Sequence, residues 1–171
     1  PPRAAFIDAI ARRDKLRVLV VGLGNMGLSH ALAYTRIPDF EVVGVCERRI
    51  AKRDLPEALK GAKKFDDFDK ALAELKPDVV SINTLPDTHA QFAIKAMEAG
   101  AHVFVEKPLA DTIENAEKAV ATAHRTGKKL VVGYILRVHP SWVKFIEIAR
   151  QLGTPLVFRM NLNQQSNGET W

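Results

Sequence analysis

Three glycines form the clearest chemical pattern in the chain, in the stretch Gly22-Leu23-Gly24-Asn25-Met26-Gly27. They follow an apolar run at residues 17–21 and precede a helical pattern at residues 25–37. A G-x-G-x-x-G turn between a strand and a helix lets the backbone approach a pyrophosphate, and the helix N-terminus offers free N–H groups to its oxygens. The pattern therefore predicts the phosphate-holding loop of a dinucleotide site, with Asn25 and Met26 among its contacts.

An acidic residue stands where such a site holds the adenosine ribose. Glu47 ends the second predicted strand, twenty residues after Gly27, and a carboxylate there accepts hydrogen bonds from ribose hydroxyls. Because a carboxylate repels a 2′-phosphate, Glu47 favours NAD over NADP. Arg48 and Arg49 follow it, and either can instead turn toward a 2′-phosphate, so NADP stays open.

Polar residues also follow the later predicted strands, where doubly wound sheets bind their ligands. The candidates at this edge are Thr84, Leu85, His89, Glu106, Lys107 and Arg137. Lys107 either binds a substrate hydroxyl and stabilises charge as hydride leaves, or is a surface lysine paired with Glu106. His89, at a predicted helix start, is a catalyst or a capping and supporting group. Arg137 binds a substrate anion or the cofactor amide, or forms an ion pair.

Alternating strand and helix patterns would position these residues. Apolar or β-branched runs predict six strands, at residues 17–21, 41–46, 62–65, 79–83, 102–105 and 130–134. Helical patterns lie between them at residues 25–37, 51–60, 66–75, 87–98 and 112–125, with Asp66 as a cap of the third. Such alternation predicts an α/β fold, a doubly wound parallel sheet of the Rossmann type.

The flanks of this pattern predict further elements. Residues 3–13 have the pattern of an amphipathic helix, residues 140–152 that of another helix, and residues 155–163 that of an isolated strand. A lone strand is unstable and must join a sheet. We therefore expect an N-terminal helical extension (1–15), a dinucleotide-binding domain (16–137), and the connecting helix and first strand of a second α+β domain (138–171), most of which is absent.

Composition excludes several other classes. The basic residues behind the net charge of +5 are scattered and not interleaved with aromatics, so we expect no nucleic-acid partner. A solvated surface and attraction for an anionic cofactor explain the charge.

Cys46 is the only cysteine, which leaves no intramolecular disulfide and no cysteine-based metal site; we expect no metal. No apolar run approaches the roughly 18–20 residues of a membrane span. With no signal peptide evident, we expect a cytoplasmic protein with no membrane partner.

A methyltransferase is the main competing use of such a fold. A methyltransferase would carry glycines spaced more like G-x-G-x-G, and it would need no lysine at the carboxyl edge of the sheet. Gly22, Gly24, Gly27 and Lys107 therefore disfavour that interpretation.

Four segments together resemble one family. The series GLGNMG, TLPDTH, AGAHVFVEKPLA and GYILRVHP resembles the Gfo/Idh/MocA family, the group of glucose-fructose oxidoreductase and inositol dehydrogenase. The resemblance covers residues 15–160, and the Glu-Lys-Pro element within AGAHVFVEKPLA is its specific part.

The resemblance implies an N-terminal Rossmann domain and a C-terminal open β-sheet domain that supplies much of the substrate pocket and the oligomer interface, hence a homo-oligomer. It implies that Lys107 is the active-site lysine and that Glu106, Thr84 and His89 border the nicotinamide half of the cofactor. Typical substrates are sugars, cyclitols and related polyols, oxidised at a hydroxyl by hydride transfer to NAD or NADP.

Two departures from the family pattern bear on function. Thr84 is followed by Leu85 in place of the usual proline, which is displaced to Pro86. The Asp and His of the family's proton relay, which belong to the C-terminal domain, have no counterpart within these 171 residues. A second hypothesis therefore remains beside the oxidoreductase: a non-catalytic dinucleotide-binding sensor or interaction module.

Overall fold

The computed structural model describes residues 15–161. It divides the chain into two units, Pro1–Gly133 and Tyr134–Trp171, each described here by itself. The division falls after Gly133, four residues before the end of the predicted dinucleotide-binding domain. The predicted helix at 3–13 lies outside the described residues.

The first unit is built on a six-stranded parallel sheet with the order β3-β2-β1-β4-β5-β6. Its strands are β1 (Leu16–Val21), β2 (Phe40–Cys46), β3 (Lys63–Phe65), β4 (Val79–Ile82), β5 (His102–Val105) and β6 (Leu130–Val132). The order reverses direction between β1 and β4, which confirms the doubly wound α/β prediction and places the switch point beside β1.

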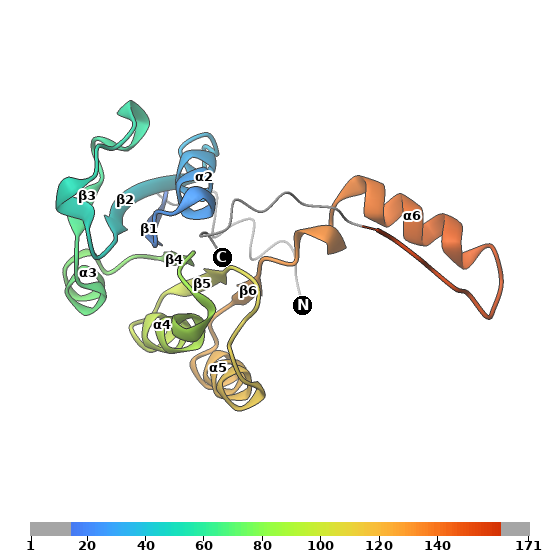
Figure 1. The fold of residues 1–171 in the computed structure, drawn as a ribbon. Coiled ribbons are helices and arrows are strands. Elements are labelled where there is room, and N and C mark those ends of the chain that lie inside the picture. Colours follow the sequence, from blue (N-terminus) through green and yellow to red (C-terminus); the bar gives the residue numbers. More distant parts are fainter. Residues whose placement is uncertain (1–14, 162–171) are drawn as a thin grey trace. The chain divides into compact units, whose positions relative to one another are not determined.

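Helices cover both faces of this sheet (Figure 1). They are α2 (Asn25–Tyr34) on one face and α3 (Phe68–Leu75), α4 (Pro86–Glu98) and α5 (Ile113–Thr126) on the other. The β1 side chains Val18, Leu19 and Val20 alternate between the two cores and are fully buried. Burial on both faces explains the continuous apolar run at residues 18–21 of β1.

Residues 51–60 differ from the prediction of a helix. They form two short 3-10 turns, η1 (Ile50–Lys52) and η2 (Glu57–Leu59), separated by extended backbone. Pro56 accounts for the break, because proline disfavours a helical conformation in the residue before it and offers no N–H for a helical hydrogen bond. The prediction of one charged helix here was wrong.

Several helix ends also shift. Asp67 caps α3 by accepting a hydrogen bond from the Lys70 N–H, so the cap lies one residue after the predicted Asp66. Helix α4 begins at Pro86, since proline fits the first turn of a helix, where its missing N–H costs nothing. Thr112 caps α5, with its hydroxyl oxygen accepting a hydrogen bond from the Asn115 N–H.

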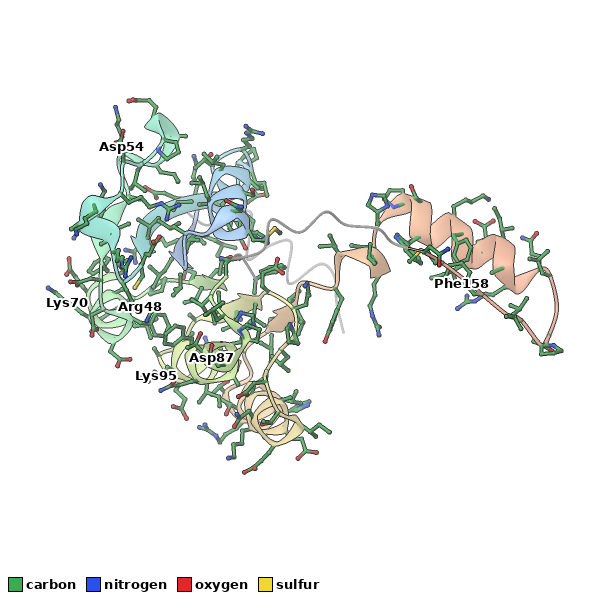
Figure 2. The ribbon with its side chains drawn as sticks, in the orientation of Figure 1. Arg48, Asp54, Lys70, Asp87, Lys95 and Phe158 are labelled. Carbon is green, nitrogen blue, oxygen red and sulfur yellow. The ribbon has the colours of Figure 1, made fainter. Side chains whose placement is uncertain are left out.

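The second unit has η3 (Ile135–Arg137) and α6 (Pro140–Arg150) within its described residues. The predicted strand at 155–163 is wrong over residues 155–161, which have no regular structure. A strand needs a neighbour to share its hydrogen bonds; here the Phe158 ring, labelled in Figure 2, instead packs on Phe145 of α6, with ring centroids 4.9 Å apart.

Candidate functional site

The glycine loop closes tightly where β1 meets α2. Gly22 has φ of +78°, and a Cβ there would lie 2.7 Å from the carbonyl oxygen of Asn83. A Cβ at Gly27 would collide with the backbone carbonyl of Gly22. Gly22 requires glycine for its backbone conformation. Both Gly22 and Gly27 also require glycine because neighbouring atoms leave no room for a Cβ.

Gly24 is different, because a Cβ there would meet nothing within 4 Å. It is the N-cap residue of α2 and has no side chain to bond the first N–H groups of that helix. The first turn, which includes Asn25, Met26 and Gly27, contains no acidic residue. Space and uncapped N–H donors at a helix N-terminus are what a phosphate group requires.

This loop forms one wall of a pocket of about 430 Å³ at the carboxyl ends of β1, β2 and β4. The pocket is lined by Val21, Gly22, Leu23, Gly24, Cys46, Glu47, Arg48, Asp66, Phe68, Asn83, Thr84, Leu85, Asp87, Thr88 and Phe92. The pocket thus brings together six of the predicted site residues, Gly22, Gly24, Glu47, Arg48, Thr84 and Leu85. Arg48 and Asp87, labelled in Figure 2, come from the loop after β2 and from the first turn of α4.

Glu47 has an ion-pair partner that the sequence did not reveal. One guanidinium nitrogen of Arg53 lies 3.1 and 2.7 Å from its two carboxylate oxygens, and both side chains are about one-quarter to one-third exposed. The extended backbone at Arg53 lets the chain return toward the end of β2. The Glu47 carboxylate is therefore held in place from the side of η1.

Asn83 lies buried at the end of β4, beside the same pocket. Its Nδ2 donates to the carbonyl oxygen and the hydroxyl of Ser81, at 3.1 Å each. Its Oδ1 has no hydrogen-bond partner among residues 15–161. A buried acceptor without a partner costs free energy, so Asn83 carries an unsatisfied polar atom beside the pocket.

His89 lies behind the pocket and is 1% exposed. Its Nδ1 is 2.7 Å from the carbonyl oxygen of Pro108, and its Nε2 is 3.0 Å from that of Thr84. The imidazole thereby links the loops after β4 and β5. This geometry favours the supporting role over the catalytic one for His89.

Glu106 and Lys107 follow β5. The Glu106 carboxylate is buried and bonds to His30 of α2, with Nε2 and Oε1 3.0 Å apart, while its other oxygen accepts the Lys107 N–H at 3.2 Å. The exposed ammonium of Lys107 forms no hydrogen bond or ion pair with the described part of the chain. Lys107 is therefore not the Glu106-paired surface lysine of the alternative interpretation.

Cys46 ends β2 and is buried against the pocket wall. Burial raises the pKa of its thiol to about 12, and the negative charges of Asp67 and Asp66 act in the same direction. The raised pKa favours the neutral thiol near pH 7, which is the less nucleophilic form.

Arg137 belongs to the second unit, where its guanidinium lies 5.9 Å from the centre of the Tyr134 ring. Its place beside the cofactor stays a prediction. The pocket described above is formed entirely by residues 21–92.

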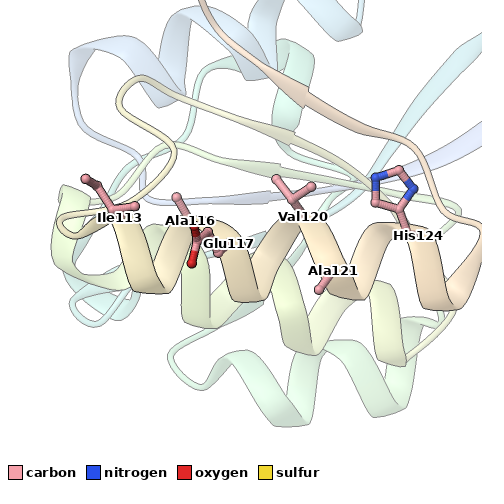
Figure 3. A pocket seen from close by; sticks show the side chains of 6 residues that line it. All are labelled: Ile113, Ala116, Glu117, Val120, Ala121 and His124. Atoms are coloured by element: carbon pink, nitrogen blue, oxygen red, sulfur yellow. The ribbon is translucent and has the colours of Figure 1, made fainter.

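Other features offer weaker sites. A second hollow is lined only by residues of α5, as Figure 3 shows, and brings no side chains of other elements together. Within residues 15–161, no group of three or more His, Cys, Asp or Glu side chains is arranged to hold a metal ion. No helix in that range is long and apolar enough to cross a membrane.

A family profile described as an oxidoreductase family with an NAD-binding Rossmann fold matches residues 16–134. The chain belongs to the Gfo/Idh/MocA oxidoreductase family. It is 37% identical over 121 residues to D-glucoside 3-dehydrogenase of Escherichia coli, and 34% identical over 138 residues to UDP-N-acetylglucosamine 3-dehydrogenase of Acidithiobacillus ferrooxidans. These alignments cover 70% and 81% of this chain but only 34% and 42% of the relatives.

A solved structure agrees with this assignment. The scyllo-inositol dehydrogenase of Lactobacillus casei, determined with NAD(H) and scyllo-inositol bound, has a TM-score of 0.72 and 27% identity to the chain. The match covers 81% of this chain and 42% of that one. The chain therefore corresponds to the Rossmann portion of these three dehydrogenases and spans 34% to 42% of their length.

Proposed function

We propose that this chain holds the nicotinamide cofactor of a dehydrogenase that oxidises a hydroxyl of a sugar, cyclitol or related polyol. The observation that carries the proposal is the open, uncapped N-terminus of α2 at Gly24, in a pocket at the switch point of the sheet. The unpartnered Asn83 Oδ1 on the same wall adds a second position for a ligand. A bound nicotinamide dinucleotide would supply the hydride acceptor.

The loop residues hold the phosphates in this proposal. The N–H groups of Asn25, Met26 and Gly27 donate to the pyrophosphate, and Gly24 gives the oxygens room. Thr84 and Leu85 form the opposite wall. His89 and Glu106 support the site without lining the pocket. Both are buried, and His89 bonds to the carbonyl oxygen of Pro108 while Glu106 bonds to His30 of α2.

NAD is the preferred cofactor in this proposal. Glu47 lines the pocket and accepts the ribose hydroxyls, while its negative charge disfavours a 2′-phosphate. Arg53 neutralises part of that charge and bonds to both Glu47 carboxylate oxygens. Arg48 lines the same pocket and offers a further positive charge to the 2′-phosphate of NADP in the alternative.

Lys107 contacts the substrate in this proposal. Its side chain is exposed and unpaired within residues 15–161, and its backbone is fixed by Glu106. The ammonium binds the reacting hydroxyl and stabilises the oxygen as negative charge develops on it, while the hydroxyl proton passes to a base outside the described residues. The remaining contacts to the polyol come from outside the described residues.

The proposal is tested with the intact protein that carries this chain. It is incubated with NAD and a panel of inositols, glucosides and UDP-sugars, and nicotinamide reduction is followed by absorbance. Reduction that requires one of these polyols supports the proposal. Stoichiometric cofactor binding with no reduction by any of them would favour the sensor hypothesis.

Two further expectations belong to the same proposal. A single buried thiol, Cys46, is compatible with the reducing cytoplasm. Homo-oligomerisation through a second domain, expected from the family resemblance, is checked by the mass of the intact protein in solution.

A further inference from the structure

A side-chain pair joins the helix of the glycine loop to the turn that carries Lys107. His30 lies on α2, one turn after Gly27. Its Nε2 is 3.0 Å from Oε1 of Glu106, and the two side chains are only 18% and 11% exposed. Since this pair is largely shielded from water, removing one partner leaves the other as an unpaired buried polar group, which costs free energy.

The Glu106 carboxylate is confined on several sides. Its second oxygen accepts the Lys107 N–H at 3.2 Å, and its own N–H donates to the Ile82 carbonyl at 2.9 Å, which continues the β4–β5 ladder. A Cβ on Gly133 would lie 3.3 Å from Oε1. Glu106 therefore has little freedom, and His30 holds the oxygen on the side of α2.

The His30 ring also packs on Phe104, with centroids 5.1 Å apart and planes inclined by 43°. His30 thus makes two separable interactions: a ring contact with Phe104 and a polar contact with Glu106. Only the polar contact reaches the backbone of Lys107, through the two oxygens of one carboxylate.

We propose that His30 is a positioning residue for Lys107. By holding Glu106, it fixes the backbone at Lys107 relative to α2, the helix whose N-terminus binds the cofactor phosphates. The inference rests on the proposed function for its catalytic consequence, but its structural content, the restraint on Lys107, stands apart from it.

Two substitutions separate the interactions of His30. His30→Gln keeps an N–H donor near the position of Nε2 but removes the aromatic ring. His30→Phe keeps a ring on Phe104 but removes the donor. If His30 only packs on Phe104, His30→Phe restrains Lys107 as the wild type does and His30→Gln does not. If His30 positions Lys107 through Glu106, His30→Gln keeps the restraint and His30→Phe loses it.

The first readout is hydrogen exchange of the Lys107 amide, measured by NMR in the 171-residue chain without cofactor. We expect His30→Phe to speed this exchange roughly tenfold, with the core amide of Val20 unchanged, and His30→Gln to restore slow exchange. Equal exchange in the wild type and His30→Phe would overturn the proposal. If His30→Phe does not fold, His30→Ala is measured with the same expectation.

The second readout is turnover of the intact protein. We expect His30→Phe to lower kcat roughly tenfold while the KM for NAD changes less than about twofold, and His30→Gln to recover most of the loss. A His30→Phe variant with wild-type kcat would overturn the catalytic part. A wild type that transfers no hydride would refute the proposed function, whereas the exchange measurement would still decide whether His30 restrains Lys107.

Discussion

The carboxylate of Glu47 and the guanidinium of Arg53 form an ion pair at the end of β2, with one Arg53 nitrogen 3.1 and 2.7 Å from the two oxygens. The pair places a positive charge within hydrogen-bond distance of the acidic residue that we assign to the adenosine ribose. Cofactor selectivity at this site therefore depends on both residues.

Glu47→Ser is expected to shift selectivity toward NADP. The substitution removes the charge that repels a 2′-phosphate and frees Arg53 to meet it, so the ratio of NADP to NAD affinity should rise about tenfold or more. Calorimetric titration with both cofactors measures this ratio. Combining Glu47→Ser with Arg53→Gln should cancel most of the gain, and Glu57→Ser, on an exposed turn, is the matched control.

Gly27→Ala is expected to destabilise the fold. The added Cβ meets the backbone carbonyl of Gly22, which cannot move without opening the loop, so the free energy of unfolding should fall by roughly 1–3 kcal/mol. Urea denaturation measures the change. Gly61→Ala places its Cβ in open space and should change stability by less than about 0.5 kcal/mol; equal losses in the two variants would contradict the close approach of Gly27 to Gly22.

Cys46 gives the stability of the protein a specific pH dependence. Burial raises the pKa of its thiol from 9.0 to about 12, so between these values the unfolded chain loses a proton that the folded chain keeps. The stabilisation is complete below about pH 9 and is lost as the pH rises toward 12, by up to about 1.4 kcal/mol per pH unit.

Cys46→Ala provides the comparison for this slope. We expect its unfolding free energy to fall less steeply than that of the wild type over the same alkaline range, whatever the absolute stabilities. Parallel slopes in the two proteins would show that the Cys46 thiol ionises with an ordinary pKa.

Lys107→Ala is expected to affect turnover far more than cofactor binding. The Lys107 side chain is exposed and makes no bond to residues 15–161, so its removal should leave the fold and the pocket wall intact. We expect kcat of the intact protein to fall at least about a hundredfold and the NAD dissociation constant to change less than about threefold. Lys118→Ala, on the exposed face of α5, is the control.

Local signals explain what the sequence could predict. The apolar run of β1 and the glycine loop each need only neighbouring residues to be recognised, and the structure has both. The alternation of such segments was enough for the parallel sheet, because a parallel connection requires a crossover.

Other features depend on residues far apart in the chain. The bond between His30 and Glu106 joins positions separated by 76 residues, and the unpartnered Oδ1 of Asn83 is visible only when its surroundings are known. The Arg53–Glu47 pair does not follow from the sequence, because the pattern of residues 51–60 predicts a helix and the pair depends on the extended backbone at Arg53. The strand predicted at 155–163 failed over its described part because a strand is defined by a partner, and alternation in one segment cannot supply it.

The central claim is that the loop at Gly22 to Gly27 holds a nicotinamide dinucleotide, and titration of the 171-residue chain with NAD tests it most directly. We predict one-to-one binding that Gly24→Val weakens at least about tenfold, because its side chain fills the space for the pyrophosphate. The variant should stay folded, because a Cβ at Gly24 meets nothing within 4 Å and valine at this N-cap should lower the free energy of unfolding by only about 1 kcal/mol. Gly61→Val should bind like the wild type. Unchanged NAD affinity in Gly24→Val, or no binding by a folded wild-type chain, would contradict the assignment.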